Sequence, residues 1–122
     1  MVAWAVPIGH RNRMPAAVDA RNHVTLQGRL AAAPHERTLP SGDALVHFRV
    51  VVSRARKRDG GPTVDTLDCV AWTAALRKRL LRLDPGQEVA VAGALRRRVW
   101  RSERTTASRC EVEVTDVRRV PP

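Results

Sequence analysis

The segment TLDCVAWTAALRKRLLRLDPGQEVAVAGAL, residues 66–95, changes its hydrophobic periodicity twice. Residues 66–72 (TLDCVAW) and 88–95 (EVAVAGAL) are short runs with the apolar pattern of strands. Between them, residues 74–83 predict a helix, because leucines recur there at helical spacing among cations: Leu76, Leu80 and Leu83. An Asp-Pro-Gly turn at residues 84–86 ends this helix. The segment therefore predicts a strand, a helix and a second strand.

Alternating apolar side chains predict three further strands, at residues 23–30, 44–52 and 110–117. Gly28, inside the first of them, is typical of a close backbone approach in a small, strongly curved sheet. Proline and glycine mark a loop around residues 34–43. The complete order is three strands, one helix and two strands. A helix between the third and fourth strands of a five-stranded, all-β barrel is the arrangement of the OB-fold.

A chain of 122 residues has room for one such domain and little else. Residues 1–22 show no sustained periodicity, so we expect a flexible N-terminal extension followed by an OB-fold domain over residues 23–120. No apolar run approaches the roughly 18 residues of a membrane span. The N-terminal residues place apolar side chains ahead of the charges, the reverse of a secretory signal. We therefore expect a cytoplasmic protein.

Cysteine and carboxylate spacing argues against a catalytic or metal site. Cys69 and Cys110 lie far apart in alternating segments and are predicted to be small core residues in a reducing compartment. No histidine stands at metal-ligand spacing to either of them, so neither a metal nor another cofactor is expected. Asp65 and Asp68 point to opposite faces of their strand. With no catalytic triad and no phosphate-binding glycine loop, the sequence does not indicate an enzyme.

The charge of the chain favours a polyanionic partner. Lys and Arg number 22 against 12 Asp and Glu, a net charge of +10. Residues 96–109 (RRRVWRSERTTASR) hold six arginines against Glu103. A second basic hairpin loop spans residues 53–66, with these cations: Arg54, Arg56, Lys57 and Arg58. Two such hairpins could close around a flexible strand as an electrostatic funnel.

Aromatic side chains are few: three Trp and one Phe. Trp100 lies between Arg98 and Arg101 and is predicted to stack on bases, a contact worth roughly 1–3 kcal/mol per base in any sequence. Trp72 ends a strand just before the helix, and its position leaves packing and stacking equally open. Phe48 lies on the apolar face of its strand and is predicted to be core.

From residue 23 to residue 120 the chain resembles the bacterial single-stranded DNA-binding proteins of the homotetrameric OB-fold type. The resemblance rests on four motifs in this order and spacing: HVTLQGRL, LPSGDALVHFRVVVSR, DCVAW and LDPGQEVAVAGALRRRVW. It implies that single-stranded DNA is the ligand and that Trp72 and Trp100 occupy family stacking positions. It further implies that Arg96 and Arg98 occupy basic positions that face nucleic acid.

The resemblance also implies a homotetramer, in which the apolar Leu67 lies close to subunit contacts. Two family aromatics are replaced here, one by Arg56, whose guanidinium plane can still stack, and one by Thr66, which cannot. The sequence ends at Pro122 without the acidic, hydrophobic tip of the family. This departure from the family indicates either an accessory paralogue or a protein without the family's recruiting role, so recruitment of repair or replication proteins is not expected.

The expected function is sequence-independent binding and protection of single-stranded DNA in replication, repair or recombination. The residues expected to bind it are Trp72, Trp100, Arg54, Arg56, Lys57, Arg96, Arg98 and Arg101. A basic OB module that binds structured RNA or ribosomes would use the same cations and aromatics. Composition leaves this alternative open, and only the family motifs favour DNA.

Overall fold

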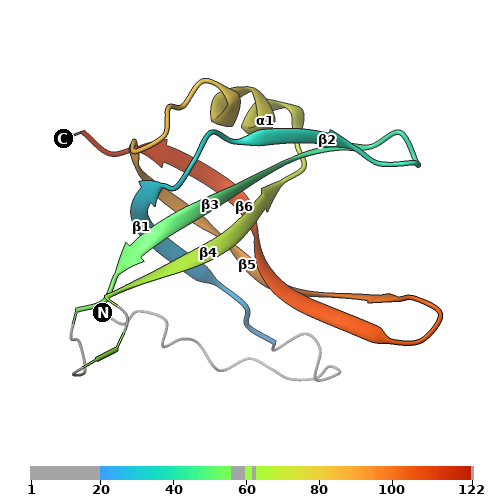
Figure 1. The fold of residues 1–122 in the computed structure, drawn as a ribbon. Helices are drawn as coiled ribbons and strands as arrows, with labels where there is room; N and C mark the ends of the chain where they lie inside the picture. The colour runs from blue at the N-terminus through green and yellow to red at the C-terminus, as the bar shows by residue number, and fades with distance from the viewer. Residues whose placement is uncertain (1–19, 56–59, 62, 122) are drawn as a thin grey trace, which may run out of the picture.

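The computed structural model describes residues 20–55, 60, 61 and 63–121. Of the predicted extension over residues 1–22, residues 1–19 lie outside this part of the chain. The described residues form six strands and one helix, in the order β1 (Val24–Leu30), β2 (His35–Thr38), β3 (Ala44–Ser53), β4 (Val64–Ala71), α1 (Ala74–Leu81), β5 (Glu88–Arg101) and β6 (Thr106–Arg119) (Figure 1).

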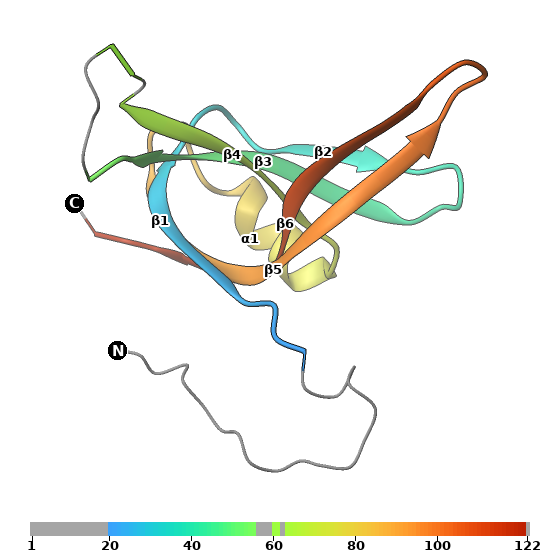
Figure 2. The ribbon, with the colours of Figure 1, turned by 90° about the horizontal axis from the view of Figure 1, so that it is seen from below.

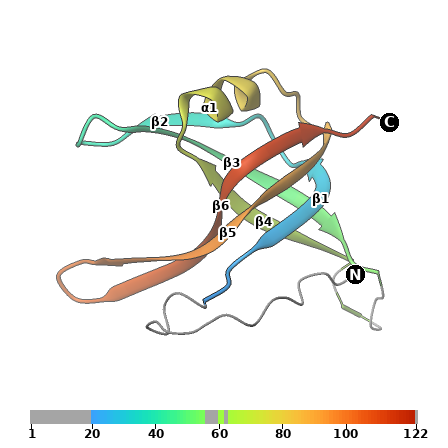
Figure 3. The ribbon, with the colours of Figure 1, turned by 180° about the vertical axis from the view of Figure 1, so that it is seen from behind.

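These strands form one sheet in the order β1-β5-β6-β4-β3-β2, which closes on itself where β1 also pairs with β3. The closing pairs are Arg29 with Val51 and Leu30 with Val50. Neighbouring barrel strands are antiparallel except β4 and β6, which are parallel. The predicted five-stranded OB-fold barrel is therefore confirmed, and β2 lies outside it as an added strand on the edge of β3 (Figure 3).

Strand β2 lies in the segment from which the sequence predicted a loop. All four of its residues are exposed, so it has no alternation between buried and exposed side chains. β1 pairs with β3 only at Val50 and Val51, so the first half of β3 has no barrel strand on this edge. β2 forms on this free edge, where His35 pairs with His47. This pairing is set by tertiary structure and leaves no pattern in the local sequence.

The barrel interior is filled by the predicted alternating residues. Val46, Phe48 and Val50 of β3 are all nearly inaccessible to solvent, and so is Cys69 of β4. The remaining barrel strands and the helix complete the same cluster with Leu30, Ala71, Leu76, Leu80, Leu83, Val89, Val91, Val112, Val114 and Val117. Phe48 is thus a core residue, as predicted.

Helix α1 follows β4 in the chain and covers one end of the barrel, where it packs against β6, β3 and β2 (Figure 1). It begins after Thr73, whose hydroxyl accepts a hydrogen bond from the amide of Leu76 at 3.3 Å, a favourable N-cap. It ends at Leu81, two residues before the predicted end, although Leu83 is still buried. Gly86, at φ 85°, then turns the chain into β5. No helix in the described part of the chain is long and apolar enough to cross a membrane.

Two strand glycines allow neighbouring backbones to approach closely. A Cβ atom on Gly28 would overlap the carbonyl of Val51, where β1 meets β3. A Cβ atom on Gly93 would overlap the backbone of Glu113 and Val114, beside a β-bulge between Ala92 and Gly93. The close approach predicted from Gly28 is present, and Gly93 serves the same purpose at the bulge that bends β5.

Strands β5 and β6 continue past the barrel as a long two-stranded hairpin, which Figure 2 shows projecting from the body of the fold. The hairpin turns through residues 102–105, where the amide of Ser102 donates to the carbonyl of Thr105 at 2.8 Å. Cys110 lies on this hairpin and is exposed, so its predicted place in the core is wrong. Its strand keeps the alternation of a core strand, but at Cys110 the hairpin has left the barrel that would cover it.

The two cysteines are expected to differ sharply in reactivity. Burial raises the pKa of the Cys69 thiol to about 12, and the charges of Asp68 and Glu111 raise it further. Because the thiolate is the reactive form, iodoacetamide at pH 8 should modify Cys110 alone in the folded protein. Intact-mass spectrometry should find one adduct before denaturation and two after it. The Cys110→Ser variant should show none while folded; a native adduct on that variant would contradict the burial of Cys69.

Candidate nucleic-acid interface

One side of β3, β4, β6 and β5 points away from the core, and we call it the outer face. Residues paired directly across strands point to the same side of a sheet. His47 of β3 pairs with Val70 of β4, Val70 pairs with Glu113 of β6, and Glu113 pairs with Ala94 of β5. All four side chains therefore point to this side. Four strands that are distant in sequence thus form a continuous surface.

The predicted residues of β5 lie on this surface at alternate positions. Arg96, Arg98 and Trp100 follow Ala94 along the strand and therefore point to the same side. Trp100 is 50% exposed, a high fraction for a large aromatic side chain. It pairs across the hairpin with Ala107, whose small side chain cannot cover the indole ring. An exposed ring beside two cations can stack on an unpaired base.

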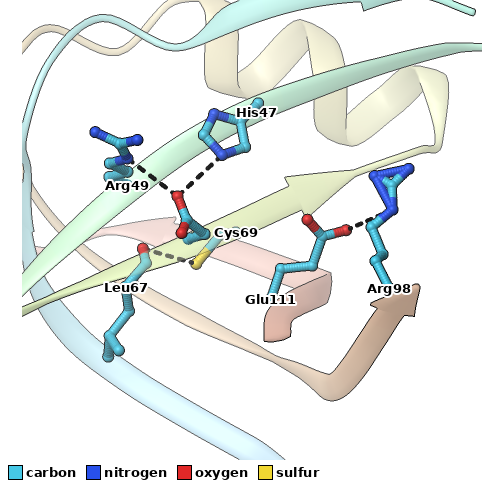
Figure 4. Close-up of polar contacts among 7 residues, drawn as sticks. His47, Arg49, Leu67, Cys69, Arg98 and Glu111 are labelled. Atoms are coloured by element: carbon cyan, nitrogen blue, oxygen red, sulfur yellow. Dashed lines mark hydrogen bonds and ion pairs between the residues drawn. The ribbon is translucent and has the colours of Figure 1, made fainter. Parts of the chain in front are cut away.

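Two acidic residues of β6 hold the two arginines on this face. The Nε of Arg96 lies 2.7 Å from Oε1 of Glu113, and the Nε of Arg98 lies 3.6 Å from Oε2 of Glu111. The Glu111 side chain is only 5% exposed, so Arg98 neutralises a buried carboxylate (Figure 4). Neither acid was predicted from the sequence as a partner of these arginines. Phosphate binding by Arg96 or Arg98 must therefore share the guanidinium with a carboxylate or displace it.

A second polar cluster lies on β3 and β4. Asp68 Oδ1 accepts from Nε of Arg49 at 3.0 Å and lies 3.1 Å from Nε2 of His47, as Figure 4 shows. Partial burial disfavours the charged form of Asp68, but the hydrogen bond and charge of Arg49, with a smaller contribution from His47, outweigh it. The pKa of Asp68 is therefore lowered below its ordinary value. Asp68 is ionised at neutral pH and fixes both neighbouring side chains.

Trp72 lies at the edge of the outer face, directly after β4. Its carbonyl accepts a hydrogen bond of 2.9 Å from Nη1 of Arg77, which ties it to the first turn of α1. The indole is partly buried and lines a pocket of about 340 Å³ together with Glu113. Glu113 also forms an ion pair with Arg96, so Trp72 and Arg96 lie on either side of the same acid. Trp72 thus combines packing against the helix with access to the face.

The basic hairpin between β3 and β4 lies apart from these residues. Nε and Nη2 of Arg54 both donate hydrogen bonds to the carboxylate of Asp65, the shortest at 2.8 Å. These hydrogen bonds and the negative charge of Asp65 raise the pKa of Arg54. Arg56 and Lys57 lie outside the described residues. In Figures 1 and 2 this hairpin and the β5–β6 hairpin project away from each other on opposite sides of the barrel.

The β5–β6 hairpin also carries arginines that form no ion pair with the described part of the protein. Across the described part of the chain, four exposed arginines of this hairpin form no ion pair: Arg97, Arg101, Arg104 and Arg109. Of these, Arg97 donates to the hydroxyl of Ser108 at 3.3 Å. Arg101, the one predicted site residue among them, stands next to Trp100.

The family model for the single-strand binding proteins matches residues 21–120. The chain belongs to this family. Its members are OB-fold proteins that bind single-stranded DNA and are not enzymes, so the predicted family and the predicted absence of catalysis are both confirmed.

One sequence relative supports the same assignment, and one solved structure shows the same fold. The chain is 35% identical over 98 residues to the single-stranded DNA-binding protein of Treponema pallidum (strain Nichols), covering 79% of this chain and 56% of that protein. The chain thus spans little more than half the length of this relative. Its fold matches a solved structure titled Plasmodium falciparum SSB complex with ssDNA, with a TM-score of 0.71 and 18% identity over 84% of this chain and 96% of that one.

Proposed function

We propose that the domain over residues 23–120 binds single-stranded DNA without base preference along the outer face, and so protects it during replication, repair or recombination in the bacterial cytoplasm. The observation that carries the proposal is Trp100, half exposed beside Arg98 and Arg101 on a projecting hairpin. A stacking ring accepts any unpaired base, whereas the paired bases of a duplex cannot reach it.

The cations of the proposed site fall into two groups. Arg104 in the turn and Arg109 on the outer face supply phosphate contacts without breaking an ion pair of the described structure, and Arg97 and Arg101 supply them from the other side of the two-stranded hairpin. Arg96 and Arg98 are oriented by Glu113 and Glu111 and take up phosphate at the expense of those contacts. Trp72 extends the path from β5 towards the helix. Arg54, Arg56 and Lys57 extend it at the opposite hairpin.

Tryptophan fluorescence tests this proposal directly. Oligo-dT is expected to quench the fluorescence strongly, and a duplex of equal charge far less, because Trp72 and Trp100 require unpaired bases. Titrations at two salt concentrations separate stacking from counterion release. Equal quenching by the duplex would leave only a general polyanion binder, and stronger quenching by oligo-rU would favour the RNA-binding alternative.

The protein is expected to assemble as a homotetramer. Among the described residues, β1 pairs with β3 only at Arg29 and Leu30, which leaves the edge of β1 from Val24 to Gly28 open on that side. An unpaired strand edge readily accepts a strand from another chain. Leu67, near the start of β4, is a partly buried apolar residue that suits a subunit contact. Light scattering at micromolar concentration should give about 54 kDa, four chains of 13.5 kDa; a mass of one chain would contradict the tetramer.

A further inference from the structure

A separate pocket opens where the connection between β1 and β2 crosses β3. It has a volume of about 300 Å³, and its polar lining consists of His35, His47 and Arg49. The opposite wall is the alanine run at residues 31–33. The wall is held in place because the amide of Ala31 donates to the carbonyl of Arg49 at 3.0 Å. Backbone pairing with β3 therefore fixes both ends of the connection, at Ala31 and at His35.

His47 and Arg49 are held in place by Asp68 but keep free hydrogen-bonding groups. Asp68 holds His47 through Nε2 and Arg49 through Nε. Within the described structure, the Nδ1 of His47 and the two terminal nitrogens of Arg49 have no hydrogen-bond partner. His35 stands directly across from His47 in the β2–β3 pairing. Two histidines and an arginine with free hydrogen-bonding groups thus line one small space, together with Phe48 and three alanines.

This pocket is continuous with the proposed DNA path. Arg49 pairs across the sheet with Asp68, and Arg96 pairs with Glu111 on the same outer face. A strand that lies on Arg96 and crosses β6 and β4 therefore arrives at Arg49 and His47. The volume of the pocket, about 300 Å³, is at the lower end of the usual range for ligand pockets. A space of this size fits one planar base and excludes a duplex.

We propose that this pocket is a nucleotide subsite, in which one base of the bound strand packs against His35 and His47 while Arg49 contacts the adjoining phosphate. The proposal rests on the proposed function, because the strand must first lie on the outer face. It supplies ring contacts on a face where Thr66 replaces a family aromatic. Histidine rings can stack on bases as aromatic residues do.

Histidine ring resonances test the subsite. The chain has four histidines, and single His→Ala variants assign their ring signals in ¹⁵N-labelled full-length protein. At a fixed pH of 8, oligo-dT should shift the signals of His35 and His47. His23, exposed at the start of β1 and outside the pocket, is the control and should not shift.

Affinity supplies the second measurement. His35→Ala and His47→Ala should each weaken oligo-dT binding about five- to tenfold, the lower part of the range for one stacked ring, and His23→Ala should leave it unchanged. His35 makes no contact with Asp68, so its variant keeps the Arg49–Asp68 pair; circular dichroism confirms that each variant is folded. Tryptophan quenching without histidine shifts or affinity loss would overturn the subsite and leave the proposed function standing. Absence of quenching would overturn the proposed function itself.

Discussion

Replacing Gly93 by alanine is expected to destabilise the fold by about 3 kcal/mol or more, at the upper end of what overpacking costs. The added Cβ would overlap the backbone of Glu113 and Val114, which cannot move aside as a flexible side chain can. The strand pair would have to separate at the bulge that directs β5 into the projecting hairpin. Urea denaturation followed by circular dichroism measures the loss of unfolding free energy.

Gly42→Ala is the matched control for this substitution. Gly42 has φ 97°, but nothing lies within 4 Å of the Cβ that alanine would add. Its cost is therefore limited to the left-handed backbone, roughly 1–2 kcal/mol. If both variants lose the same free energy of unfolding, the close approach at Gly93 does not hold the two strands in register.

The barrel was predictable because its signals are local. In β3 the alternation places Val46, Phe48 and Val50 on one side, and the same residues are buried in the structure. The change from alternation to helical spacing at residues 74–83 marks α1 in the same way. Strand β2 was not predictable, because its four exposed residues acquire strand geometry only from the free edge of β3.

The candidate site was predictable in its cations and aromatics but not in their partners. The run RRRVWR identifies β5 as a basic strand with an exposed ring. The ion pair of Arg96 with Glu113, however, joins residues 17 positions apart that are not directly opposite each other, because Arg96 pairs across the hairpin with Glu111. Cys110 shows the same limitation. Alternation identifies its side of the strand, but the barrel ends before it reaches that residue.

Replacing Trp100 by alanine is expected to weaken binding of single-stranded DNA by roughly 1–3 kcal/mol, the contribution of one stacked base. The slope of log affinity against log salt should change little, because no cation is removed. Trp100 lies beyond the barrel and is half exposed, so the variant should fold as the parent does. Fluorescence anisotropy with labelled oligo-dT at several salt concentrations gives both quantities.

The matched cation variant for this comparison is Arg101→Ala rather than Arg98→Ala. Arg98 faces the nearly buried carboxylate of Glu111, and its removal would leave that charge unpaired, so lost stability would be mixed with lost binding. Arg101 has no ion pair among the described residues, and for a single strand each lost phosphate contact should reduce the salt slope by about 0.7. Trp100→Ala should therefore lower affinity at constant slope, and Arg101→Ala should lower both. If Trp100→Ala unfolds the protein or flattens the slope as Arg101→Ala does, then Trp100 packs against protein or positions cations, and base stacking occurs elsewhere on the outer face.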